Sequence, residues 1–232
     1  CPVIIKPAEL TPLTALAAAE LAIRAGIPAG VLNMLCADSA NSIAIGKVLC
    51  ESDVVRHISF TGSTGVGRKL MRGSSDQLKR LSLELGGSAP VLVFPDVDVD
   101  RVAEANVRGK FRNNGQVCIA AARFYVHRSV YDEYVEEVVR RAEALVVGDP
   151  MQEGTNCGPL YAREAVDRMT ALVDDARSRG ARILAGGRSP EGSGFGRGFW
   201  FLPTVLDRVP PDARLRREET FGPIMPLFAF DT

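Results

Sequence analysis

The sequence has 232 residues, of which 46% are hydrophobic and 24% charged, as expected for a globular protein with one large or two modest domains. Basic and acidic residues balance at 28 each and are interspersed, which disfavours nucleic acid and anionic membranes as partners. No apolar run approaches the roughly 20 residues of a membrane helix, and the N-terminus lacks a signal-peptide pattern.

The first part of the chain alternates short apolar runs with helical patterns. Val3–Lys6 predicts a buried strand. Thr11 and Pro12 predict a helix start, with threonine as N-cap and proline in the first turn, and Gly26 predicts its end. Further strands are predicted at 31–35, 57–61 and 81–85, and further helices at 41–50 and from the turn at 62 through 71. This alternation predicts βαβ units and a parallel sheet.

The pair Gly86-Gly87 is predicted to mark a domain boundary. After it, strands are predicted at 90–94, 123–127, 182–184 and 225–230, helices at 99–111, 131–146 and 163–179, and a glycine-rich loop at 186–198. The expected fold class is α/β, with a parallel-sheet unit over 1–86 and a second α/β unit over 87–232. Both ends of the chain are strand-like, so we expect a segment of a longer protein.

A glycine-rich turn, FTGSTGVG, spans Phe60–Gly67 between a predicted strand and a predicted helix. Such a turn aims backbone N–H groups at an anion, usually a phosphate. The P-loop pattern needs lysine and then a hydroxyl residue after the second glycine, but Arg68 and Lys69 follow. The dinucleotide fingerprint GxGxxG needs a glycine where Leu70 stands. A tight turn without a ligand therefore remains equally open at this point.

Five motifs occur in a characteristic order: IKPAELTP at 5–12, FTGSTGVG at 60–67, LELGGSAP at 83–90, FRNNGQVC at 111–118 and EETFGP at 218–223. Together they resemble the aldehyde dehydrogenase superfamily, and are most similar to its succinate-semialdehyde dehydrogenase branch. The resemblance implies the C-terminal part of a Rossmann-like, parallel-sheet NAD(P)-binding domain over 1–86 and an incomplete α/β catalytic domain over 87–232. It also implies oxidation of an aldehyde to a carboxylic acid.

The resemblance implies that Cys118 is the nucleophile and that Glu84 activates the water that hydrolyses the thioester. Taken alone, a single cysteine is usually inert packing, and Glu84 is either a hydrogen-bonding residue at a strand end or a base whose pKa is raised by burial. Glu84 also argues against the CoA-acylating branch, which typically lacks this glutamate. The other cysteines, Cys1, Cys36, Cys50 and Cys157, are assigned to packing. Without a CxxC pair we expect no metal site, and we expect a reducing, cytoplasmic setting.

The resemblance also implies a set of cofactor-binding residues. These are Lys6, Ala8, Glu9, Phe60, Thr61, Gly62, Ser63, Val66, Leu85, Gly86, Glu219 and Phe221. Glu9 is expected to accept hydrogen bonds from the adenosine ribose and to repel a 2′-phosphate, which favours NAD over NADP, although Lys6 weakens that preference. Glu219 and Phe221 are expected to hold the nicotinamide ribose and ring.

Arg112 precedes Cys118 by six residues, and in the succinate-semialdehyde dehydrogenase branch an arginine at this offset pairs with the far carboxylate of the substrate. A guanidinium offers a carboxylate two parallel N–H donors. A surface arginine, and a longer ω-carboxylated or an aromatic aldehyde, remain open. The branch often carries a second cysteine two residues after the nucleophile, but Ala120 stands there, so we expect no redox control by a cysteine pair.

The family's upstream PWNFP-like segment, whose asparagine helps to stabilise the oxyanion, is absent from these residues, as is the C-terminal oligomerisation segment. We therefore expect weak or no activity from the isolated segment, and a homodimer or homotetramer for the parent enzyme. Two alternatives are a catalytically silent relative with a binding or scaffolding role and a phosphate-binding NTPase. Intact Cys118, Glu84 and Glu219 disfavour the first, and the missing P-loop lysine disfavours the second.

Overall fold

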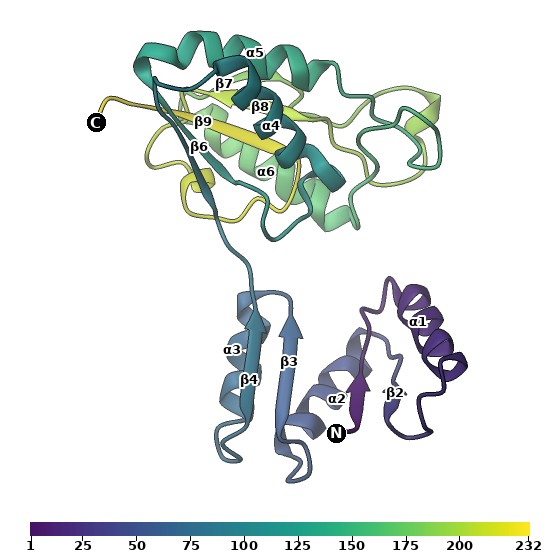
Figure 1. Cartoon of the computed structure of the whole chain (residues 1–232). Coiled ribbons are helices and arrows are strands. Elements are labelled where there is room, and N and C mark those ends of the chain that lie inside the picture. Colours follow the sequence, from purple (N-terminus) through teal and green to yellow (C-terminus); the bar gives the residue numbers. More distant parts are fainter. The chain divides into compact units, whose positions relative to one another are not determined.

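The structure is a computed structural model that describes residues 1–232 and divides into two units, Cys1–Leu85 and Gly86–Thr232 (Figure 1). The assignment of cofactor binding to residues 1–86 and of catalysis to residues 87–232 stays a prediction. None of the helices combines the length and the apolar character needed to cross a lipid bilayer.

The first unit has the predicted order of strands and helices. Its elements are β1 (Val3–Ile5), α1 (Pro12–Arg24), β2 (Leu32–Met34), α2 (Ser39–Glu51), β3 (His57–Thr61), α3 (Thr64–Gly73) and β4 (Arg80–Glu84). The pairs β1–β2 and β3–β4 are both parallel, as expected for βαβ units. The expected α/β class with parallel strands is confirmed, and in this unit the strands form two separate two-stranded sheets.

Local backbone chemistry sets the helix ends in this unit. Gly26 adopts a left-handed φ of +84° and its N–H donates to the carbonyl of Ile23, which ends α1 as predicted. Thr11 occupies the N-cap position of α1, but its side chain makes no capping hydrogen bond, so the predicted role of its hydroxyl is wrong. Proline in the first turn needs no N–H partner, which lessens the need for that cap.

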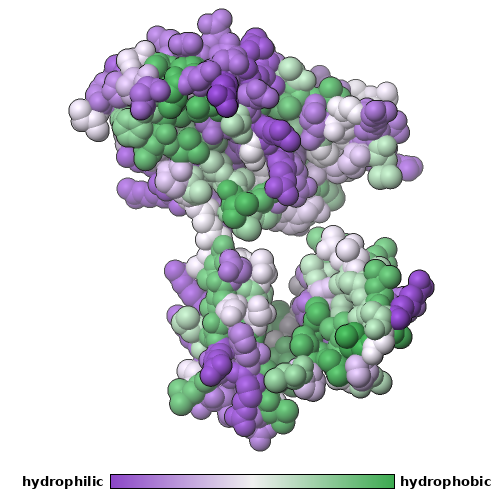
Figure 2. Space-filling model, viewed as in Figure 1, coloured by the Kyte–Doolittle hydropathy of each residue, from purple (hydrophilic) through white to green (hydrophobic).

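Much of the apolar surface of the first unit is exposed. Val3, Ile4 and Ile5 of β1 are 47%, 50% and 39% exposed, and α1 has no buried residue. Figure 2 shows hydrophobic side chains gathered on the surface of this unit. The predicted burial of the first strand is therefore not found, and β1 and α1 are held mainly by local hydrogen bonds and by pairing with β2.

The second unit is built on a five-stranded sheet in the order β5-β6-β9-β8-β7. Its strands are β5 (Pro90–Val93), β6 (Arg123–His127), β7 (Arg182–Ala185), β8 (Thr204–Asp207) and β9 (Ile224–Phe230). Its α-helices are α4 (Val99–Phe111), α5 (Tyr131–Glu143) and α6 (Arg163–Ser178), and short 3₁₀ turns are η1 (Arg112–Gly115), η2 (Arg128–Val130), η3 (Ser193–Phe195) and η4 (Arg214–Arg216). All neighbouring strands are parallel except β7, which pairs antiparallel with β8 at the edge.

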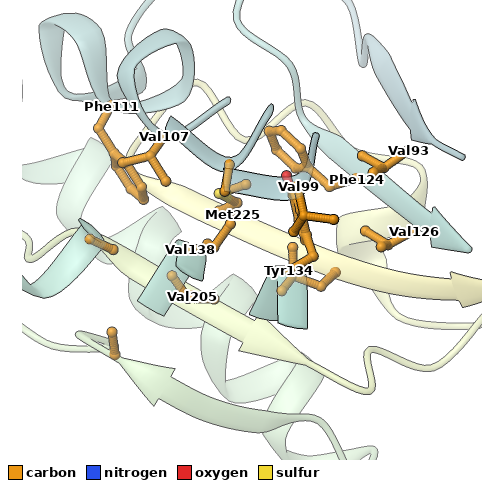
Figure 3. Close-up of a cluster of buried hydrophobic side chains, with 14 of the residues drawn as sticks. Val93, Val99, Val107, Phe111, Phe124, Val126, Tyr134, Val138, Val205 and Met225 are labelled. Carbon is orange, nitrogen blue, oxygen red and sulfur yellow. The ribbon is translucent and has the colours of Figure 1, made fainter. Parts of the chain in front are cut away.

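Two apolar cores lie on opposite faces of this sheet. Val99, Val107 and Phe111 of α4 and Tyr134 and Val138 of α5 pack on one face against inward side chains of the strands (Figure 3). On the other face α6 packs against Leu206 and Ile224. Successive residues of β9, Ile224 and Met225, point into different cores, as the alternation of a strand requires. This two-layered cover makes the sheet a rigid support for the turns at its ends.

Two elements differ from the sequence expectation. The helix predicted over 131–146 ends at Glu143, because Val147 forms a bridge with Cys157 and the N–H of Val146 donates to the side chain of Asn156. The strand β8 was not predicted, although all four of its residues are buried. It is short and follows Pro203, so it lacks a clear alternating pattern.

Candidate active site

The candidate nucleophile lies on a turn that directly follows α4. Asn113, Asn114 and Gly115 have left-handed φ values of 49°, 55° and 73°, which reverse the chain after the helix. Asparagine and glycine tolerate this region better than other residues, so their order here has a conformational reason. Cys118 follows in a turn closed by a hydrogen bond from Ala120 N–H to the Val117 carbonyl, and its side chain is exposed. The sulfur is therefore accessible and not sealed in apolar packing.

Side-chain amides fix this turn to the segment 158–161. Asn114 is 1% exposed and donates through Nδ2 to the carbonyl of Gly158 at 2.9 Å. Gln116 accepts from the N–H of Tyr161 at 2.9 Å and donates to the carbonyl of Asn113 at 3.1 Å. These bonds hold the backbone that carries Cys118, whose own N–H has no acceptor within the chain.

The second turn of this site carries Glu219 and Phe221. Phe221 has a left-handed φ of 44°, and Gly222 approaches the backbone of Gly115 so closely that a Cβ at 115 would lie 2.5 Å from the Gly222 carbonyl carbon. The carboxylate of Glu219 lies against the Cα of Gly86, where a Cβ would be 3.1 Å from Glu219 Cδ. The structure therefore brings together three predicted motifs, those around Gly86, Cys118 and Glu219.

A buried lysine belongs to the same cluster and was not predicted from the sequence. Lys110 on α4 is 1% exposed and donates to the hydroxyl of Thr220 at 3.1 Å. Lys110 follows Val107 by three residues and therefore lies on the buried face of the helix. This spacing could have identified it from the sequence as a lysine at a core position.

In the first unit the predicted phosphate turn and the predicted base are neighbours. Thr61 pairs with Glu84 in the β3–β4 register, and the N–H of Gly62 donates to the Glu84 carbonyl at 3.0 Å. The Ser63 hydroxyl caps α3 by accepting from the N–H of Val66 at 3.3 Å. The N–H groups of the first turn of α3 are those that a helix leaves for an anion.

Close packing around this turn involves two further predicted residues, Phe60 and Leu85. The ring of Phe60 lies under Gly62, and the side chain of Leu85 packs against Gly67 of α3, where a Cβ would be 3.0 Å from Leu85 Cδ1. Glu84 itself is exposed, so the burial considered for its side chain is absent. The expected meeting of Glu84 with Cys118, which lie in different units, stays a prediction.

Lys6, Ala8 and Glu9 lie just beyond β1. Ala8 and Glu9 line a surface hollow together with the segment 36–39 that follows β2, at the carboxyl ends of two parallel strands. Lys6 Nζ lies 3.8 Å from Glu9 Oε2 and donates to the carbonyl of Pro7 at 2.6 Å. The two opposite charges expected at the adenosine ribose are therefore paired with each other.

Arg112 and the remaining cysteines complete the predicted set. Arg112 is exposed at the start of η1, and no hydrogen bond or ion pair engages its guanidinium. Cys50 and Cys157 are buried, as expected for packing, and burial raises the pKa of the Cys157 thiol to about 11. Cys1 and Cys36 are exposed, so their assignment to packing is wrong. Both belong to the first unit, whose core is small.

Comparison with known proteins agrees with this arrangement of motifs. The model of the aldehyde dehydrogenase family matches residues 1–232. The chain belongs to the aldehyde dehydrogenase family. This membership sets aside the NTPase alternative for the turn at 60–67.

Several relatives of this chain are named as semialdehyde dehydrogenases. It is 44% identical to the succinate-semialdehyde dehydrogenase [NADP(+)] of Escherichia coli over 230 residues, 99% of this chain and 46% of that protein. It is also 44% identical to the glutarate-semialdehyde dehydrogenase of Pseudomonas putida, with the same coverage. A crystal structure of an E. coli NADP-dependent enzyme matches with a TM-score of 0.95 at 44% identity, covering 100% of this chain and 47% of that one. The chain thus spans about half the length of these relatives.

Proposed function

We propose that this chain carries the nucleophile, the base and much of the cofactor site of an NAD(P)-dependent aldehyde dehydrogenase. The observation that carries the proposal is the exposed Cys118 on a turn whose backbone packs against the turn of Glu219. A reactive thiol needs access to its substrate and an electron acceptor held next to it; the exposed sulfur and the adjacent Glu219 turn support this proposal.

The reaction follows from the roles of these residues. The Cys118 thiolate attacks the aldehyde carbon and forms a thiohemiacetal, whose oxyanion is able to accept a hydrogen bond from the free N–H of Cys118. NAD(P), when bound, supplies the acceptor for the hydride that leaves this carbon, and a thioester remains on Cys118. Glu84 then takes a proton from the water that hydrolyses the thioester, which releases the carboxylic acid and restores the thiol.

The residues present fit a dinucleotide. The capped first turn of α3 suits a pyrophosphate, and Glu9 and Glu219 suit ribose hydroxyls because carboxylates accept two hydrogen bonds each. A preference for NAD is not supported by the E. coli relative, whose name specifies NADP(+). The pairing of Lys6 with Glu9 also weakens the repulsion of a 2′-phosphate. The NAD preference thus stays a prediction, tested by the ratio of kcat/KM for the two cofactors; equal values would refute it.

The test of the reaction uses a full-length protein that contains this sequence. We expect NAD(P)H formation from a panel of small aldehydes, and a loss of turnover in Cys118→Ala. Cys1→Ala is the matched control, because Cys1 is also exposed but does not line the hollow of Glu9 in the first unit. Dehydrogenase turnover that survives in Cys118→Ala would remove the assigned nucleophile. The predicted homodimer or homotetramer and the cytoplasmic location stay predictions.

For the substrate we propose an aldehyde with a distant carboxylate, such as succinate semialdehyde. The support is the exposed and unpaired guanidinium of Arg112, together with relatives named for succinate and glutarate semialdehydes. Because a hydrogen-bonded charge pair contributes about 1.5–3 kcal/mol, Arg112→Ala is expected to raise KM for succinate semialdehyde about 10- to 100-fold and to leave butanal unchanged. Arg108→Ala, one turn earlier on α4 and also exposed, is the control. An unchanged preference between the two aldehydes contradicts the proposal.

A further inference from the structure

Lys110 is a charged residue at a core position. The inward stripe of α4 consists of Val99, Ala103, Val107 and Phe111, all buried, and Lys110 falls on the same side in the last turn. Figure 3 shows Val107 and Phe111, which flank this position, directed into the core. The Lys110 side chain is 1% exposed, and its one hydrogen bond goes to the hydroxyl of Thr220 at 3.1 Å.

This placement is unfavourable for folding alone. An ammonium carries three donors and loses its hydration on burial, and one hydrogen bond to a neutral hydroxyl restores little of it. Burial lowers the pKa of Lys110 to about 7, while the negative charge of Glu219 raises it. An unbranched apolar side chain such as methionine would fill the same volume without this penalty. Lys110 therefore contributes through its positive charge and through the hydrogen bond that its ammonium donates, and not through stabilisation of the core.

The charged end of Lys110 faces the turn that carries Glu219. Thr220, the acceptor of the Lys110 hydrogen bond, is the next residue after Glu219 and is itself 1% exposed. Arg168 on α6 donates to the backbone carbonyl of Glu219, and the Glu219 side chain lies against Gly86. The turn is thus held at the Glu219 carbonyl by Arg168 and at the Thr220 hydroxyl by Lys110.

We propose that Lys110 is a positioning residue for the cofactor site: its ammonium anchors Thr220 and attracts the Glu219 carboxylate, so that this carboxylate is held ready for the ribose hydroxyls of a nicotinamide dinucleotide. The inference rests on the cofactor role proposed for Glu219. It adds a residue in the helix before the nucleophile to those that determine cofactor affinity. Lys110 itself touches neither substrate nor cofactor in this proposal.

The test compares variants of a full-length protein that contains this sequence. Lys110→Met keeps the volume and removes the charge, and Thr220→Val keeps the ammonium and removes its acceptor. Val107→Ala is the matched control, since it loosens the same stripe of α4 one turn earlier and its apolar side chain donates no hydrogen bond to the turn. For each variant the Kd for NADH and NADPH is measured by fluorescence titration, with kcat, the KM of cofactor and aldehyde, and the thermal midpoint.

We expect Lys110→Met to raise the Kd and KM of the cofactor about tenfold, with an unchanged aldehyde KM and a thermal midpoint equal to or above that of the wild type. Thr220→Val is expected to raise the Kd about threefold, which decides the matter if Lys110→Met does not fold. Val107→Ala is expected to lower the midpoint and to leave the Kd unchanged. Wild-type cofactor affinity in the folded lysine and threonine variants would overturn this inference alone. A wild-type protein that binds neither dinucleotide would overturn the proposed function as well.

Discussion

Replacing Gly115 with alanine tests the contact between the nucleophile turn and the Glu219 turn. Gly115 has a φ of +73°, and an added Cβ would lie 2.5 Å from the carbonyl carbon of Gly222 and 3.1 Å from the nitrogen of Pro223. Carbon atoms in ordinary contact are about 3.5–4.0 Å apart, so one turn has to move by about 1 Å. Both neighbours are backbone, so no side-chain rotation relieves the overlap.

The loss of unfolding free energy has two parts. Alanine in the left-handed region costs about 1–2 kcal/mol, and overpacking a close contact costs about 1–3 kcal/mol more. Gly154→Ala separates them, because Gly154 has a similar φ of +88° with nothing within 4 Å of its added Cβ. Replacing glycine with alanine also lowers the conformational entropy of the unfolded chain, which stabilises the folded state. This effect is the same in both variants and cancels in their comparison. Gly115→Ala should therefore be the less stable variant by about 1–3 kcal/mol.

Urea unfolding of the two variants measures this difference, and steady-state kinetics of the full-length protein measures its effect on the site. A displacement of about 1 Å between reacting groups costs roughly 100-fold in rate, so kcat/KM of Gly115→Ala should fall by that order while Gly154→Ala stays near the wild type. Equal stability of the two variants would refute the steric reasoning. Wild-type kcat/KM in Gly115→Ala would show that catalysis does not depend on the close approach of the two turns.

Two further expectations concern the base and a buried ion pair. Glu84→Gln should form the thioester but hydrolyse it slowly, giving a burst of NAD(P)H followed by slow turnover; a wild-type steady rate would exclude Glu84 as the base. Burial of Asp207 opposes its ionisation, but hydrogen bonds from Tyr131, at 2.5 Å, and Arg182 lower its pKa below the ordinary value. Its stabilising contribution is thus present above the unfolded-state pKa of about 3.9 and is lost as pH falls through the lower folded pKa. Tyr131→Phe should reduce the unfolding free energy near neutral pH by about 1.5–3 kcal/mol, as followed by denaturant titration; an unchanged midpoint would show that the bond contributes nothing.

Segments with regular apolar spacing and clear capping residues were predictable from the sequence. Segments whose ends depend on tertiary contacts were not. The strands at His57–Thr61 and Arg123–His127 and the helix at Val99–Phe111 have the predicted bounds, because apolar spacing and capping residues define them locally. The helix predicted to reach Val146 stops at Glu143, since a bridge between Val147 and Cys157 competes for its last turn.

The motifs of the site were found from the sequence, but not the contacts that hold them. The resemblance drew attention to Cys118, Glu219 and Gly86, while their proximity depends on two close approaches at glycines that no local pattern reveals. Lys110 was missed for a related reason. A lysine on a helix is ordinarily solvated, and only the fold shows that Lys110 is buried and hydrogen-bonded to Thr220.

The close approach of Glu219 to Gly86 links two positions that lie more than a hundred residues apart in the chain. Any side chain at 86 would enter the space that the carboxylate occupies, and a Cβ there would already lie 3.1 Å from Glu219 Cδ. A designer who wished to keep the Glu219 carboxylate in place would therefore have to keep glycine at 86, and a larger residue at 86 would be paired with a shorter one at 219. Varying position 86 alone would displace the Glu219 carboxylate from the place that it occupies here.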